Sequence, residues 1–140
     1  MISAKIKYDI NIMKYISLFE NITLTKVKDC IEKEGYLIFI VNQNDIAKAI
    51  GRNGANIKRL SQLLNRKIKI VEFNPNVSQF IRNYIKPLDV ANIEEDNGNV
   101  TINGRDSKTK GMLIGRDNKN LDDLNSIVKR YFKIDNIKVK

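Results

Sequence analysis

The 140-residue chain contains no histidine, no tryptophan and a single cysteine, and these absences exclude several kinds of chemistry. Without histidine there is no Ser-His-Asp or Cys-His nucleophile system, no His-ligated zinc and no imidazole general base. One cysteine cannot form an internal disulfide or a cysteine-rich metal site. No phosphate-binding P-loop or other cofactor fingerprint is present either. We therefore expect no enzymatic activity, no cofactor and no bound metal.

Long hydrophobic runs are also missing. The longest one extends only from Tyr36 to Val41, far short of the roughly 20 residues that span a bilayer. Residues 1–7 lack the apolar segment and cleavage site of a signal peptide. We therefore expect a cytoplasmic protein without a membrane partner, in which the lone Cys30 is a small buried apolar residue rather than a reactive thiol.

Basic residues are in excess, and their distribution is uneven. The chain has 25 Lys and Arg against 16 Asp and Glu, a formal charge of +9. No acidic residue occurs from Ile46 to Val71, and seven basic residues fall in that stretch: Lys48, Arg52, Lys58, Arg59, Arg66, Lys67 and Lys69. So long a basic stretch without an acid predicts a surface that faces phosphate groups.

The chain contains an internal repeat. When residues 48–66 are set against residues 112–130, six of the 19 positions are identical. These six pairs are Ile50/Ile114, Gly51/Gly115, Arg52/Arg116, Asn56/Asn120, Leu60/Leu124 and Arg66/Arg130. The repeat predicts two similar domains, residues 1–73 and 74–140.

Both copies predict the element order α-β-β-α-α-β, and hence an α+β fold. In the first copy we expect a helix over 10–20 capped by Asp9, strands over 25–33 and 36–41, a short helix ending at Ile50, a helix after Gly54, and a strand over 67–73. In the second copy we expect a helix capped by Asn74 and ended by Pro87, a hairpin of strands 88–94 and 99–103, a short helix ending at Ile114, a longer helix, and a strand over 134–139.

The loop between the two adjacent helices of the first copy carries the functional signal. Gly51 and Gly54 lack a Cβ atom, so a phosphodiester backbone can approach the main chain. The helix that starts after this loop presents free N–H groups and a positive dipole end, which favour an anion. Arg52 adds a permanent cation, and Asn53 adds a small hydrogen-bond donor. This arrangement predicts a site for a nucleic-acid backbone, with Ile50 and Ile57 flanking a groove for bases.

The segment from Asp45 to Leu60, DIAKAIGRNGANIKRL, resembles a KH domain, whose Gly-x-x-Gly loop holds about four nucleotides of single-stranded backbone. The element order resembles the type II, or prokaryotic, form with a three-stranded mixed sheet. Two such modules in tandem, together with KYISLFEN at residues 14–21 and VKDC at residues 27–30, resemble the archaeal NusA-like proteins. These are relatives of the KH portion of the bacterial transcription termination and antitermination factor NusA.

The resemblance implies a role as a transcription elongation or termination factor. It implies single-stranded RNA as a partner, with RNA polymerase or the transcription complex as a further one, and we expect a monomer. In the family the groove is lined by the loop, its two helices and the last strand, which corresponds here to Ile50, Ile57, Lys58 and residues 68–71. The candidate RNA-binding residues are Lys48, Ile50, Gly51, Arg52, Asn53, Gly54, Ile57, Lys58, Arg59 and Arg66 in the first copy, and Gly115, Arg116, Asp117, Asn118 and Lys119 in the second. For Arg66, a solvated helix end is an equally good interpretation.

The second loop departs from the family pattern. Asn118 replaces the closing glycine, and Asp117 puts a negative charge where a phosphate would lie. Because asparagine tolerates left-handed backbone conformations, the shape of the loop can survive. Arg116 and Lys119 offset the charge of Asp117, and we expect the first loop to be the stronger site. The net charges agree, +6 for residues 1–73 (13 basic, 7 acidic) and +3 for residues 74–140 (12 basic, 9 acidic).

Two other functions fit the same fold. KH folds also serve as protein-interaction scaffolds, and an RNA-binding KH protein can act as an assembly factor on ribosomal RNA. The first loop favours RNA binding over a scaffold because it is basic and closed by glycine.

Overall fold

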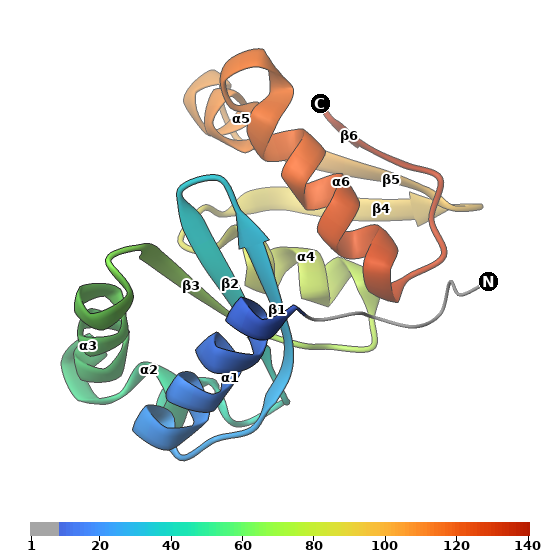
Figure 1. Ribbon diagram of the computed structural model, residues 1–140. Coiled ribbons are helices and arrows are strands. Elements are labelled where there is room, and N and C mark those ends of the chain that lie inside the picture. Colours follow the sequence, from blue (N-terminus) through green and yellow to red (C-terminus); the bar gives the residue numbers. More distant parts are fainter. Residues whose placement is uncertain (1–8) are drawn as a thin grey trace. The chain divides into compact units, whose positions relative to one another are not determined.

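The computed structural model describes residues 9–140, which fall into two compact units that divide between Phe73 and Asn74 (Figure 1). Each unit contains three α-helices and a three-stranded mixed sheet. The molecule is therefore α+β, and the order of elements in each unit is α-β-β-α-α-β.

The first unit places its sheet in the order β1-β2-β3, with β2 in the middle. Strands β1 and β2 are antiparallel, and β2 and β3 are parallel. The bounds of its elements are α1 Ile10–Thr23, β1 Val27–Lys33, β2 Tyr36–Val41, α2 Ile46–Ile50, the single turn η1 Arg52–Gly54, α3 Ala55–Leu64 and β3 Lys67–Glu72.

The core of the first unit lies between its helices and one face of the sheet. Phe19 of α1 stacks on Phe39 of β2, with ring centroids 4.3 Å apart. Ala49 of α2 and Leu60 of α3 are fully buried in the same cluster. Cys30 of β1 is also buried there, as expected. The burial of both Ala49 and Leu60 holds the two helices on either side of the Gly51–Gly54 loop against the sheet.

The second unit repeats this arrangement with the sheet order β4-β5-β6. Its elements are α4 Val77–Ile85, β4 Val90–Asp96, β5 Asn99–Gly104, α5 Ser107–Ile114, the turn η2 Arg116–Asn118, α6 Lys119–Tyr131 and β6 Asn136–Val139. Phe80 of α4 is fully buried, and its ring lies 5.6 Å from the rings of both Tyr131 and Phe132. The predicted hairpin is confirmed, since Asn97 and Gly98 both have the positive φ angles of a tight turn.

The helix starts were predicted with mixed success. Asp9 caps α1 as expected, accepting a hydrogen bond from the Ile12 N–H. The assignment of Asn74 as the cap of α4 is wrong, because Asn76 accepts from the Gln79 N–H and holds that position. Asn74 instead accepts from the Asn76 N–H and shapes the turn before the helix. Two asparagines, Asn74 and Asn76, precede this helix, and only the tertiary position of its first turn selects one of them.

A separate observation concerns membranes. Within residues 9–140, no helix has both the length and the apolar character needed to cross a bilayer.

Candidate nucleic-acid interface

The Gly51–Gly54 loop of the first unit adopts a conformation that requires positive φ angles. Gly51 has φ 82°, Asn53 has φ 55° and Gly54 has φ 74°. The Gly51 N–H bonds to the Ala47 carbonyl at 3.0 Å and ends α2, and the Gly54 N–H bonds to the Gly51 carbonyl at 3.0 Å. The loop is therefore a tight turn between two helices, and its Arg52 and Asn53 side chains are exposed.

Asn56 braces this loop, a role that sequence analysis missed. Its Nδ2 donates to the Lys48 carbonyl at 3.1 Å and thereby ties the first turn of α3 to the last turn of α2. A Cβ atom on Gly51 would lie 2.9 Å from the Asn56 amide group. The Asn56 side chain therefore occupies the space that a side chain at position 51 would need. The sequence did carry a signal for this role, since Asn56 and Asn120 are identical in the two copies. Asn120 likewise donates to the Met112 carbonyl at 2.9 Å.

Helix α3 starts directly at the loop. Its N-cap residue is Gly54, and no side chain caps the helix. The N–H groups of its first turn and the positive end of its dipole therefore face the same region as the Arg52 side chain. Lys48 on α2, with Lys58 and Arg59 on α3, adds exposed positive charge to these helices. The loop and the helix start combine backbone donors with mobile cations, which suits an anionic chain.

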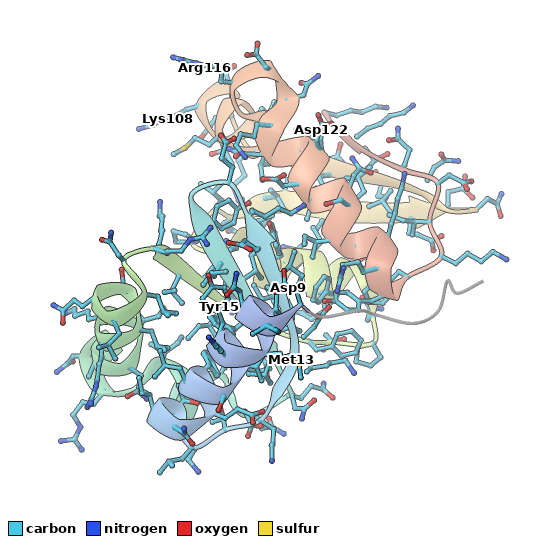
Figure 2. All side chains as sticks on the ribbon, viewed as in Figure 1. Asp9, Met13, Tyr15, Lys108, Arg116 and Asp122 are labelled. Carbon is cyan, nitrogen blue, oxygen red and sulfur yellow. The ribbon has the colours of Figure 1, made fainter. Side chains whose placement is uncertain are left out.

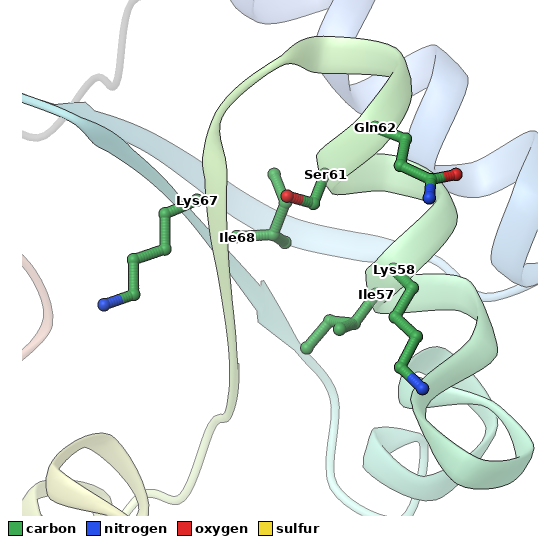
Figure 3. A pocket seen from close by; sticks show the side chains of 6 residues that line it. All are labelled: Ile57, Lys58, Ser61, Gln62, Lys67 and Ile68. Atoms are coloured by element: carbon green, nitrogen blue, oxygen red, sulfur yellow. The ribbon is translucent and has the colours of Figure 1, made fainter.

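A groove of about 370 Å³ lies beside α3, between the helix and strand β3 (Figure 3). Its lining comprises Ile57, Lys58, Ser61, Gln62, Lys67 and Ile68. In Figure 3 the side chains of Ser61 and Ile57 lie on the side of α3 that faces Ile68. The groove thus has apolar walls from α3 and β3, with two lysines at its rim.

The structure brings some of the residues expected at the groove together and leaves others elsewhere. Ile57, Lys58 and Ile68 line it, whereas Ile50 and Val71 do not. Val71 is 1% exposed and lies within the sheet. Sequence analysis did not identify Ser61 and Gln62 as lining residues, because which residues line the groove depends on how α3 packs relative to β3.

The backbone of β3 also faces this groove. β3 is an edge strand, and the Phe73 N–H just beyond its end donates to the Val41 carbonyl of β2 at 2.8 Å. Because backbone groups alternate in direction along a strand, Ile68 and Ile70 turn their N–H and C=O groups away from β2. The groove therefore offers main-chain donors and acceptors in addition to its side chains.

Arg66, a candidate contact in the sequence, is already engaged within the unit. Its guanidinium forms an ion pair with Glu32 and donates to the Lys33 carbonyl at 3.0 Å. The hydrogen bond to Glu32 is the main cause of the raised pKa of Arg66. These contacts tie the end of α3 to the β1–β2 hairpin and give Arg66 a structural role in the unit.

Lys69 of β3 is partly buried. Burial is the main cause of its lowered pKa, and the nearby charge of Lys67 lowers the pKa further. The positive charge on Lys69 is therefore less favourable in the folded protein than on a lysine in water.

The second loop reproduces the backbone of the first. Gly115 has φ 75°, Asp117 φ 55° and Asn118 φ 64°, so the expected survival of the loop shape is confirmed. Its charges differ, however. Lys119 lies 3.4 Å from Asp123, and Asp117 is exposed at the tip. The Arg116 side chain points away from the ribbon (Figure 2).

Comparison with known proteins identifies relatives of the whole chain. A family described as "NusA-like second KH domain" matches residues 16–76. The "Probable transcription termination protein NusA" of Methanococcus vannielii is 30% identical over 96% of this chain and 80% of its own length. The proteins of the same name from Methanocaldococcus jannaschii and Thermoplasma acidophilum are 29% and 27% identical, over 76% and 96% of their lengths.

A solved structure is also similar. The protein titled "Crystal structure of APE1850" is 28% identical and superposes with a TM-score of 0.74, covering 95% of this chain and 100% of its own.

Proposed function

Because the chain belongs to the family of archaeal NusA transcription termination proteins, we propose that it binds single-stranded RNA through a KH domain within residues 1–73. Residues 74–140 form a second KH domain in this proposal, and both domains are of type II. The element order α-β-β-α-α-β, found in both units, supports this assignment.

The observation that carries the proposal is the loop that opens onto a groove. Residues 51–54 hold the RNA backbone, with phosphates against the N–H groups of Arg52 and Asn53, the start of α3 and the Arg52 guanidinium. The adjoining groove, with Ile57 and Ile68 in its walls, receives a base. Phosphate contact supplies affinity that depends on salt, and the groove supplies preference among bases.

The remaining residues of the first site have distinct roles in this proposal. Lys48, Lys58 and Arg59 are exposed and attract the phosphate chain. Asn53 donates from the loop tip, and Ile50 supports the loop from the end of α2. Arg66 is given a structural role, because its guanidinium is already bound to Glu32 and Lys33.

The second loop is proposed as the weaker site. Gly115, Arg116, Asn118 and Lys119 form the same turn, but Asp117 stands at its tip. A carboxylate 4 Å from a phosphate costs about 1 kcal/mol in water and more where water is excluded.

The biological role proposed is that of a NusA-like elongation or termination factor acting on nascent RNA. Its partners are RNA and, through RNA, the transcription complex or RNA polymerase. It acts without catalysis, as a monomer in the cytoplasm. The names of its relatives support this role.

The double variant Arg52→Asp with Asn53→Asp tests the clamp. It places two carboxylates at the proposed phosphate position, so RNA affinity is expected to fall by at least a hundredfold, with the fold unchanged by circular dichroism. Binding of a 12-nucleotide single-stranded RNA, measured by fluorescence anisotropy at several salt concentrations, gives the affinity. If about four phosphates are neutralised, the wild-type slope of log affinity against log salt is about −3.

The control is Arg116→Asp with Asn118→Asp, which makes the same change of charge in the second loop, where the counterpart of Asn53 is already Asp117. We expect it to lower affinity by less than tenfold. Equal binding by wild type and the first-loop variant, both folded, would remove the RNA clamp and favour a protein-interaction scaffold.

A further inference from the structure

The two units differ in the space between their last helix and last strand. In the second unit Asn125 of α6 crosses this space. Its Oδ1 accepts from the Ile137 N–H of β6 at 3.1 Å, and its Nδ2 donates to the Leu121 carbonyl at 3.2 Å. The side chain of Asn125 therefore occupies the backbone donor that β6 would otherwise present to a ligand.

The equivalent residue in the first unit leaves the space open. Ser61 stands 64 residues before Asn125, the offset that aligns the two loops. Its hydroxyl donates to the Arg66 carbonyl at 2.8 Å, so it bonds within its own helix end rather than to β3. Ile68 pairs with Leu37 as Ile137 pairs with Val100, which makes Ile68 the counterpart of Ile137.

Among residues 9–140, this backbone donor is bound by a side chain in the second unit and not in the first. In the part of the chain that the structure describes, no side chain accepts from the Ile68 N–H, whereas Asn125 accepts from the Ile137 N–H. The groove of about 370 Å³ lies at Ile68 and includes Ser61 in its lining. That volume is at the lower end of the range for small-molecule pockets and suits a single planar base.

The charges at the corresponding positions of the two units also differ, and the first unit is the more positive. Lys58 and Lys67 line the first groove. Their counterparts are Asp122, at the 64-residue offset, and Asn136, which pairs with Asn99 as Lys67 pairs with Tyr36. The second unit thus has no positive charge at the two positions that carry these lysines in the first unit.

We propose that the residue at position 61 of the first unit, and at position 125 of the second, decides whether the groove admits a nucleobase. Ser61 keeps the first groove open, and Asn125 closes the second by binding the strand backbone in place of a base. This inference rests on the proposed RNA function and deepens it, because it names the residue that separates base recognition from backbone binding. The loop binds phosphate in either case.

The test exchanges the residue within the full-length chain. Ser61→Asn is expected to close the first groove, and Ser61→Ala removes the hydroxyl without filling the space. Affinity is measured for a 12-nucleotide single-stranded RNA and for an abasic ribose-phosphate chain of the same length. Amide hydrogen exchange at Ile68 reports whether the introduced asparagine reaches the strand.

For the wild type we expect the base-containing strand to bind about tenfold more tightly than the abasic strand, a difference equivalent to about 1.4 kcal/mol. Ser61→Asn should reduce this ratio to near one while leaving the abasic affinity within about twofold, and should slow exchange at Ile68. Ser61→Ala should keep the ratio within about twofold of wild type. Asn125→Ser should accelerate exchange at Ile137, an outcome that does not depend on the folding of the Ser61 variants.

The outcomes distinguish this inference from the function on which it rests. If the wild type binds RNA and Ser61→Asn keeps the full ratio, the residue does not control the groove, although the clamp remains. Unchanged exchange at Ile137 in Asn125→Ser would overturn the closure of the second groove. If the wild type binds neither strand, the proposed function fails, and the inference fails with it.

Discussion

At the scale of single residues, the two glycines of the first loop are required for different reasons. A Cβ on Gly51 would meet the amide of Asn56 at 2.9 Å, and that amide is held by its bond to Lys48. A Cβ on Gly54 would meet nothing within 4 Å. Gly54 is needed only for its φ of 74°, and Asn118 adopts a similar angle of 64° in the second unit.

We therefore predict that Gly51→Ala lowers the free energy of unfolding by about 2–3 kcal/mol, from left-handed strain plus the displaced Asn56 bond. Gly54→Asn should lower it by less than about 1 kcal/mol, because asparagine tolerates this conformation. Urea unfolding of both variants measures the two values. Equal losses would show that the space taken by Asn56 is irrelevant.

At the scale of elements, the two ends of α3 have separate tasks. Its start adjoins the loop, and Arg66, two residues after its end, is bonded to the β1–β2 hairpin. Ten residues of helix rise about 15 Å, so the two ends contact different parts of the molecule.

Arg66→Ala is predicted to lower the free energy of unfolding by about 1–2 kcal/mol, because it removes a charged hydrogen bond to Lys33 and the pairing with Glu32. RNA affinity should stay within about twofold of wild type. Thermal unfolding and anisotropy titration of the same preparation measure both effects. A large loss of affinity with unchanged stability would instead make Arg66 a phosphate contact.

At the scale of the whole molecule, the repeat produces two similar units with different surfaces. The second unit retains the loop backbone but carries Asp117 at the tip, Asp122 beside the groove and Asn125 across it. The formal charge of +9 is therefore divided unevenly, with +6 on residues 1–73 and +3 on residues 74–140.

Converting the second site to the first tests this difference. The triple variant Asp117→Asn, Asp122→Lys and Asn125→Ser is expected to raise the stoichiometry from one to two short RNA strands per chain, measured by isothermal titration calorimetry. As a control, Asp96→Lys with Glu95→Gln makes the same change of charge on the exposed β4–β5 hairpin. This variant should still bind one RNA strand per chain. A second strand bound by both variants would mean that added charge alone creates the site.

Much of the fold could be predicted from the sequence because its signals are local. The hydrophobic period of the helices, the turn residues at Gly35 and Asn97-Gly98, and the cap at Asp9 each act within a few neighbouring residues. The repeat also located both loops, since the pattern Ile-Gly-Arg recurs at a constant spacing. The cap at Asn76 was missed because Asn74, two residues earlier, carries the same local signal.

The sequence by itself determined the element order, the two loops and the polarity of their side chains, which depend on residues close together in the chain. Only the tertiary structure decided the pairing of Arg66 with Glu32, the hydrogen bond of Asn56 behind Gly51, and the hydrogen bond from the Ile137 N–H to Asn125. Arg66 and Glu32 are 34 residues apart, and Asn125 and Ile137 are 12 apart. Such contacts depend on how helices pack against a sheet, and that packing arises from the whole core rather than from any one segment.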